Sequence, residues 1–469
     1  MKNKVNKNGT HNLNSYPCEP YTLIVGVISG SVTQIKPLIN DIRKLSELKY
    51  LKAIEVWLLS NGANTAELTD LLQLTFTGTD IVKFTITESD KSEGILPIGK
   101  ARSTLQKLVG ARMSEVTTSF GWILDDDMTI PVTAEKYLTW LPAFKHEGVD
   151  VLIGGFNGGS PNPVAHGIRV QLNDLLHNLY WLADLPAFSK LPDRSEENKK
   201  FRMLYPDYYY DLSRKHTDHL VKPYWVVPEY KGEKVGDAHA RLIRDSYKVL
   251  TGEPYLRPLI MDLPSRPLEE SKPSCNRGGN TFILTSKALT MTPNTILLTD
   301  GKENRRSDMI WAIINKYYYK LNVQSVSFPI NHHRYIGTST SYCFNKTVGE
   351  IRGACTLCFA MSSFFESNPN YNWELLNERI DRISELYFDY INQRLELYKE
   401  NFIVINSMLD QLVPLLKTDD NSVALTLSSI REWVSLDNLE KIQKMLFSID
   451  KIKDLDFFLN NIVEQITDF

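Results

Sequence analysis

The sequence is short of cysteine and has no excess of basic residues. Its 469 residues include five cysteines, an odd and low number that does not suggest a disulfide framework and favours a reducing compartment. The 53 Lys and Arg residues are balanced by 56 Asp and Glu residues, so there is no basic surplus to neutralise phosphates. We therefore expect no nucleic-acid partner.

Long apolar runs are also missing. No stretch approaches the roughly 20 apolar residues that span a bilayer, so we expect no transmembrane segment. Residues 1–20 are polar and rich in Asn and Lys, without the apolar core of a signal peptide, which predicts a flexible leader on a cytoplasmic protein. Cys355 and Cys358 form one C-x-x-C without a second pair, and His216 and His219 lack further ligands, so zinc is disfavoured at both places.

What the sequence does contain is a regular alternation of strands and helices in its first third. A near-continuous apolar run predicts a buried strand at 21–30, and further strands are predicted at 53–62, 81–89 and 121–124. Segments with helical periodicity separate these strands, including a basic-faced helix at 99–116. Strands that alternate with helices in this way indicate an α/β fold with a mostly parallel sheet.

Two further regions interrupt or follow this pattern. Residues 160–270 are irregular and aromatic-rich, and because a structureless loop of that length is implausible, we interpret them as an inserted subdomain or lid. Apolar residues recur at three- and four-residue intervals from about 350 to 469, which predicts a C-terminal helical domain. The main domain then covers 21–345, insert included.

The stretch 'GWILDDDMTI' places three carboxylates directly after a buried strand. Carboxylates packed together repel one another unless a cation lies between them, and a divalent metal is the usual solution. If the strand continued, Asp125 and Asp127 would share one side and Asp126 would point away. The alternative is a solvated turn that ends in a helix cap.

Two later motifs are candidates for the same site. Gly278 and Gly279 in 'CNRGGN' would let the backbone approach a ligand closely, or they simply form a loop before a strand. His332 and His333 in 'INHHRY' follow a predicted strand, and one neutral imidazole could bind a metal.

The stretch 'NRRSD' adds charged residues at a predicted helix start. Arg305 and Arg306 could pair with phosphate oxygens. Asp308 could take a proton as a general base, but a carboxylate at a helix N-terminus is also common for electrostatic reasons alone.

In this chain order the motifs resemble those of GT-A fold nucleotide-sugar glycosyltransferases. Those enzymes share an Asp-x-Asp motif, a glycine-rich loop, an acidic 'xED' helix start and a late metal-binding His. The run 'IVGVISGS' resembles their first strand, with Ser29 lining the nucleotide pocket, and 'GKARSTL' resembles their 'ARN' helix, with Lys100 and Arg102 near the diphosphate. The resemblance covers about 20–160 and 275–335; this chain has 'SD' in place of 'ED' and a longer gap before the glycines.

The resemblance implies a GT-A fold with an inserted subdomain and a C-terminal helical domain. It also implies sugar transfer from a nucleotide-diphosphate donor, most commonly a UDP-sugar, to an unknown acceptor such as a glycan, a lipid-linked glycan or a protein. Asp127 would be the main ligand of Mn²⁺ or Mg²⁺, with His332 or His333, and Asp125 would contact the metal or the nucleotide. Asp126 would contact the nucleotide, and Asp308 would act as base.

Two other functions stay open at this point. A sugar-nucleotide nucleotidyltransferase would use a similar sheet and metal, although 'VISGSVTQIKP' lacks the usual G-x-G-x-R-like signature. A non-catalytic scaffold would use the helical tail for partner binding, and the same tail could form a homo-oligomer. Aromatic residues of the insert could stack on acceptor sugar rings or serve only in packing: Tyr208, Tyr209, Tyr210, Tyr224, Trp225 and Tyr230.

Overall fold

The computed structural model describes most of the chain. The described residues are 19–89, 94–158, 164–194, 201–202, 220–221, 225–251, 259–275, 279–294, 298–299, 302–303, 307–333, 344–352, 354–416, 421–447, 460, 462 and 464–469. Several residues singled out from the sequence lie outside this set: Tyr208, Tyr209, Tyr210, His216, His219, Tyr224, Gly278, Arg305 and Arg306, with the side chain of Cys355.

An eight-stranded sheet forms the centre of the fold, with strand order β11-β15-β6-β12-β4-β1-β2-β3. Its members are β1 (Tyr21–Ser29), β2 (Leu51–Ser60), β3 (Val82–Glu88), β4 (Ser119–Asp125), β6 (Val151–Ile153), β11 (Lys272–Pro273), β12 (Asn280–Ile283) and β15 (Val323–Ser325). The strands β1 to β4 are parallel, as are β6 and β15, whereas β12 and β11 run antiparallel to their neighbours. The predicted α/β fold with a mostly parallel sheet is confirmed.

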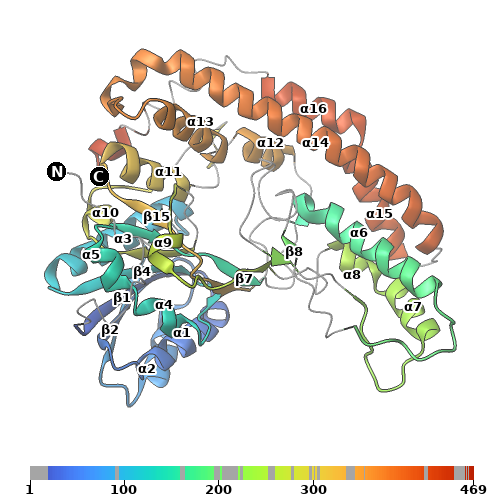
Figure 1. Ribbon diagram of the computed structural model, residues 1–469, viewed down its shortest axis with the longest axis horizontal. Coiled ribbons are helices and arrows are strands. Elements are labelled where there is room, and N and C mark those ends of the chain that lie inside the picture. Colours follow the sequence, from blue (N-terminus) through green and yellow to red (C-terminus); the bar gives the residue numbers. More distant parts are fainter. Residues whose placement is uncertain are drawn as a thin grey trace.

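Helices cover both faces of this sheet (Figure 1). They are α1 (Val32–Leu45), α2 (Thr65–Phe76), α3 (Ile98–Glu115), α4 (Ala134–Leu138), α5 (Leu141–His146), α9 (Pro267–Glu270), α10 (Lys287–Thr290) and α11 (Ser307–Ile313), which continues as a π-helical turn (Ile314–Tyr318). Successive β1 residues enter different cores: Val25 packs in the core that contains α1 and α2 side chains, and Ile24 in the core that contains α3 side chains. Burial on both faces explains why β1 is almost continuously apolar.

A second sheet of six short strands, in the order β5-β16-β7-β10-β9-β8, leads from the central sheet toward the insert. Its strands are β5 (Met128–Thr129), β7 (Phe156–Gly158), β8 (Phe201–Arg202), β9 (Leu220–Val221), β10 (Leu259–Ile260) and β16 (Ile330–His332), and β13 (Leu298–Thr299) pairs with β14 (Lys302–Glu303) separately. Because β16 pairs with both β5 and β7, the late histidines lie beside the turn that follows β4.

Helices of the described part of the insert share one core with the tail. They are α6 (Val164–Ala183), α7 (Val235–Arg244) and α8 (Ser246–Thr251); the tail contains α12 (Phe344–Arg352), α13 (Ala354–Ser367), a 3₁₀ helix (Trp373–Arg379), α14 (Ile380–Leu416), α15 (Asn421–Trp433) and α16 (Leu436–Phe447). Leu172 of α6 and Ile391 of α14 belong to the same apolar cluster. The long helix α14 extends from above the central sheet to the insert (Figure 1).

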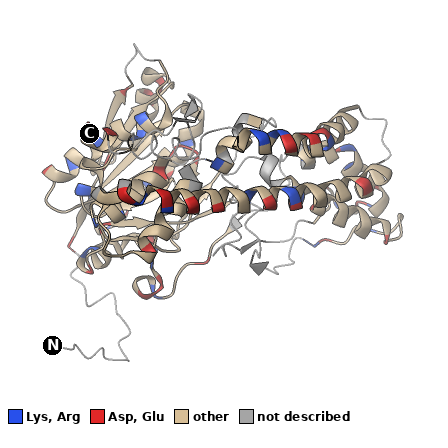
Figure 2. Ribbon diagram, turned by 90° about the horizontal axis from the view of Figure 1, so that it is seen from above, with Lys and Arg blue, Asp and Glu red and all other residues tan. Residues whose placement is uncertain are grey.

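The helices carry both signs of charge along their exposed faces (Figure 2), as the balanced composition predicts. Cys358 is buried in α13, in line with the interpretation of the C-x-x-C as part of a packed helix. Among the described residues, no helix combines the length and the apolar character needed to cross a membrane.

Candidate functional site

The candidate site lies where β1 and β4 end side by side. These parallel strands pair Ile28 with Asp125, so the loop after β1 and the acidic cluster meet at one edge of the sheet. Strand β4 ends at Asp125, and Asp126 and Asp127 form a turn before β5. The expected alternation therefore does not extend past Asp125, and the three carboxylates point to three different partners.

Asp125 contacts a helix and a glycine. Its Oδ1 lies 3.4 Å from Nη2 of Arg102 in α3. Its backbone N–H donates to the carbonyl of Gly279 at 3.2 Å, and a Cβ at Gly279 would lie only 2.2 Å from Asp125 Oδ2. A side chain at position 279 would therefore displace this carboxylate, which gives a physical reason for glycine there.

Asp126 turns toward the loop after β1. Its Oδ2 accepts from the backbone N–H of Gly30 at 3.1 Å, and its Oδ1 accepts from Nε2 of Gln34 at 3.2 Å. Burial raises the pKa of Asp126 to about 7, with smaller contributions from the charges of Asp127 and Asp125 and opposition from the Gly30 hydrogen bond. Sequence analysis missed Gly30 and Gln34, although 'SGS' directly after the first strand was a signal.

Asp127 pairs with His332. The imidazole Nε2 of His332 lies 3.1 Å from Asp127 Oδ2, and His332 is only 8% exposed. The other carboxylate oxygen, Asp127 Oδ1, is buried and has no hydrogen-bond partner among the described residues. A buried carboxylate oxygen without a donor is costly, so this atom is a natural place for a cation or another ligand.

The two neighbouring histidines occupy different environments. His333 is exposed, and its Nε2 lies 2.6 Å from Oγ1 of Thr129, while its backbone N–H donates to the carbonyl of Asp127 at 2.9 Å. Of the pair, only His332 directs its ring to an aspartate of the cluster. Antiparallel pairing of His332 with Met128 sets this difference, because adjacent strand residues face opposite ways.

Arg102 lies between two carboxylates. Besides its contact with Asp125, its Nη1 lies 4.0 Å from Oδ1 of Asp308, which is buried in the first turn of α11. The structure thus brings Asp308 to the acidic cluster through a shared guanidinium. Lys100 is exposed on the same helix, and Ser29 is buried with its hydroxyl donating to the carbonyl of Ser31 at 3.2 Å.

The side chains of the candidate site provide some of the ligands that a hard divalent cation needs. Among the described residues, no group of three or more His, Cys, Asp or Glu side chains is arranged to hold a metal ion. Asp127 supplies a carboxylate, and Mg²⁺ or Mn²⁺ is commonly bound by one or two carboxylates together with phosphate oxygens and water; His332 adds one imidazole. The unpaired Asp127 Oδ1 is the observation that favours this fit.

Comparison with known proteins gives structural similarity only. No protein-family model matches the chain, and no curated protein matches it. It is similar to the mannosyltransferase PcManGT from Pyrobaculum calidifontis in complex with GDP-Man and Mn²⁺, with a TM-score of 0.35 and 8% identity over 94% of this chain and 86% of that one. It is also similar to S. aureus TarS 1–349 in complex with UDP-GlcNAc, with a TM-score of 0.34 and 10% identity over 88% of this chain and 91% of that one.

The longer S. aureus TarS structure gives a TM-score of 0.35 and 10% identity over 90% of this chain and 55% of that one. Likeness of this degree concerns the general path of the chain, so the functional assignment depends on the residues of the site.

Proposed function

We propose that this protein is a metal-dependent glycosyltransferase that moves a sugar from a nucleoside-diphosphate donor to an acceptor hydroxyl. The single observation that carries the proposal is the Asp127–His332 pair, whose carboxylate keeps one buried oxygen without a partner. This pair lies at the end of parallel strands in an α/β sheet, which is where such folds bind their ligands.

Asp127 and His332 are the proposed metal ligands, and Asp125 is a further candidate through its second carboxylate oxygen. A bound Mn²⁺ or Mg²⁺ would act as a Lewis acid that stabilises negative charge on the departing diphosphate. Asp126, Gly30 and Gln34 form a polar corner beside these ligands, suited to hold the nucleoside half of the donor.

Arg102 and Asp308 complete the proposed machinery. Arg102 orients Asp125 and places a positive charge between Asp125 and Asp308. Asp308 is the candidate general base that accepts the proton of the acceptor hydroxyl, and a single displacement assisted in this way would invert the anomeric centre. Gly278, Arg305 and Arg306 remain proposed contacts of the donor or acceptor.

The donor is proposed to be a nucleotide sugar, with UDP-sugars as the first candidates, and the acceptor class is open among glycans, lipid-linked glycans and proteins. The experiment incubates the protein with UDP- and GDP-sugars and Mn²⁺, with water as the acceptor of the sugar, and separates the products by anion-exchange chromatography. The proposal is supported if the wild type releases nucleoside diphosphate and Asp127→Asn does not. The control Asp70→Asn, on the exposed face of α2, should release as much as the wild type. Formation of nucleoside triphosphate and sugar 1-phosphate on addition of pyrophosphate would instead identify a nucleotidyltransferase.

A further inference from the structure

Two loops of the insert form a joint tip at the end of the molecule away from the central sheet. One loop follows α6 and the other precedes α7 (Figure 1). Three backbone hydrogen bonds connect them: Leu191 N–H donates to the Glu233 carbonyl at 2.8 Å, Val235 N–H to Ser189 at 3.0 Å, and Gly236 N–H to Ala187 at 2.9 Å. The loops therefore form a single paired unit.

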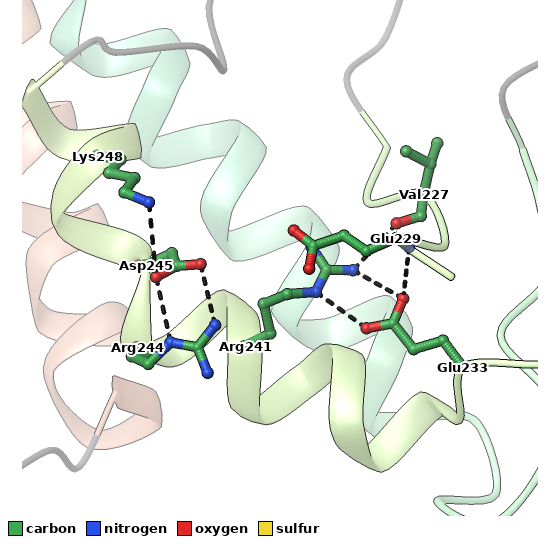
Figure 3. Close-up of polar contacts among 7 residues, drawn as sticks. All are labelled: Val227, Glu229, Glu233, Arg241, Arg244, Asp245 and Lys248. Carbon is green, nitrogen blue, oxygen red and sulfur yellow. Dashed lines mark hydrogen bonds and ion pairs between the residues drawn. The ribbon is translucent and has the colours of Figure 1, made fainter. Parts of the chain in front are cut away.

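A buried ion pair holds the second loop to α7 (Figure 3). Arg241 Nε and Nη2 donate to the two carboxylate oxygens of Glu233 at 2.9 and 3.0 Å, and Nη2 also donates to the Val227 carbonyl at 3.0 Å. Glu233 in turn accepts from the backbone N–H of Glu229 at 2.8 Å. Such a bidentate, buried pair fixes the loop conformation, so the side chains on its outer surface are presented in a defined arrangement.

The outer surface of this unit combines a protruding phenylalanine, the half-exposed Tyr230 and three lysines that form no ion pair among the described residues. Phe188 is 87% exposed, and Nζ of Lys234 lies 5.9 Å from its ring centroid. Lys190 and Lys234 face each other across an isolated antiparallel bridge, a placement that is unfavourable for like charges. Neither lysine, nor the exposed Lys231, forms an ion pair among the described residues. We call Phe188, Lys190, Lys231 and Lys234 the lysine–phenylalanine tip.

The carboxylates near the tip form no ion pair with its lysines among the described residues. Glu229 lies 3.3 Å from Arg241, and Asp237 accepts from the hydroxyl of Tyr230 at 3.3 Å. Asp184 lies six residues before Lys190 and Asp193 three residues after it, at the two ends of the first loop. The tip therefore offers positive charge around an exposed ring.

We propose that the lysine–phenylalanine tip docks this protein on an anionic phospholipid surface. A Phe ring can enter the boundary between headgroups and acyl chains while the surrounding ammonium groups meet lipid phosphates. A stable protein interface commonly buries about 800 Å² on each partner, and its centre is apolar. Here the exposed large apolar side chains of the two loops are Phe188, Tyr230 and Val227, a small apolar surface next to the lysines that fits a lipid interface better. The proposal is independent of the catalytic assignment.

The test is co-sedimentation of the full chain with vesicles of phosphatidylcholine alone or of equal parts phosphatidylcholine and phosphatidylglycerol. We expect binding to the anionic vesicles only, weakening as salt rises. Lys190→Gln with Lys234→Gln should lower the partition coefficient roughly 20- to 30-fold, since each lysine near an anionic surface contributes about 1 kcal/mol. Phe188→Ser should lower it roughly tenfold through the lost apolar contact.

Matched controls lie in the main domain, at the start of β2 and in α2. Lys49→Gln with Lys52→Gln removes two exposed lysines, and Leu74→Ser removes an apolar side chain that is 79% exposed; neither should change vesicle binding. If the protein binds neither type of vesicle, the proposal is wrong, whether or not the tip binds another protein. Equal effects of the control and tip variants would overturn it as well.

Discussion

The imidazole Nε2 of His332 lies 3.1 Å from Oδ2 of Asp127, which joins the acidic turn after β4 to a strand close to the end of the main domain. His333, the next residue, is exposed and directs its ring to Thr129 instead. Because β16 pairs with β5, these two adjacent histidines, which the sequence alone does not distinguish, lie in different surroundings.

We predict that His332→Gln weakens Mn²⁺ binding in the presence of nucleoside diphosphate by about tenfold or more, because an imidazole ligand is lost. His333→Gln should stay within about twofold of the wild type, since its ring faces away from Asp127. Electron paramagnetic resonance of free Mn²⁺ measures both. A larger loss in His333→Gln than in His332→Gln would contradict the assignment.

Gly279→Ala tests the close approach of the glycine loop to Asp125. The added Cβ would lie 2.2 Å from Asp125 Oδ2, so the carboxylate must move away from its present place. A displacement of about 1 Å near the reacting groups can lower the rate roughly 100-fold. We expect kcat for sugar transfer to fall by that order while the thermal unfolding temperature stays near that of the wild type. Full activity in Gly279→Ala would show that the position of Asp125 is unimportant.

The pKa of Asp126 gives a prediction about stability and pH. Burial raises this pKa to about 7 in the folded protein, above the value of about 3.9 for an unfolded chain. The folded state therefore binds the proton more tightly, and the free energy of unfolding falls as pH rises from about 4 to about 7. Asp126→Asn removes this loss, so the variant should gain stability relative to the wild type at pH 8 and not at pH 4.

Differential scanning calorimetry of the ligand-free protein at both pH values measures this difference. Asp70→Asn, on the exposed face of α2, is the control and should show no such pH dependence. An Asp126→Asn variant that is less stable than the wild type at pH 8 would mean that its two hydrogen bonds outweigh the burial of the charge.

A bidentate ion pair joins the central sheet to α3. Nε and Nη2 of Arg112 donate to the Glu55 carboxylate at 2.7 and 2.8 Å, and these hydrogen bonds lower the pKa of Glu55. The stabilisation is present above the unfolded pKa of about 4.3 and is lost as pH falls through the lowered folded value. Arg112→Met should cost about 1–3 kcal/mol at pH 7.

Urea unfolding at several pH values checks this prediction. The difference between wild type and Arg112→Met should shrink below about pH 4, where Glu55 becomes protonated. A constant difference at all pH values would indicate that Arg112 acts through packing of its aliphatic stem alone.

The strands β1 and β4 could be predicted from the sequence because each is buried on both faces and therefore almost continuously apolar, whereas β3, at the edge of the sheet, is only partly buried. The helix α6 was not recognised within the insert, since the assignment of 160–270 relied on its irregular and aromatic composition. The shared core of insert and tail depends on contacts between residues far apart in the sequence, such as Leu172 and Ile391, which local periodicity cannot indicate.

The site was predicted in part. The types of residue and their chain order indicated that the acidic cluster, the glycine loop, Asp308 and the histidines belong together, and the structure brings the described ones to one edge of the sheet. Orientation was less predictable: Asp126 lies in a turn where strand alternation no longer applies, and its partners Gly30 and Gln34 come from another element.

Calorimetric titration with a panel of nucleoside diphosphates, with and without Mn²⁺, tests the central claim most directly. We predict that the wild type binds one nucleotide only with metal present, that Asp127→Asn weakens this binding at least tenfold, and that Asp308→Asn keeps it. Absence of nucleotide binding under every metal condition, or equal binding by wild type and Asp127→Asn, would contradict a metal–diphosphate site at Asp127 and His332.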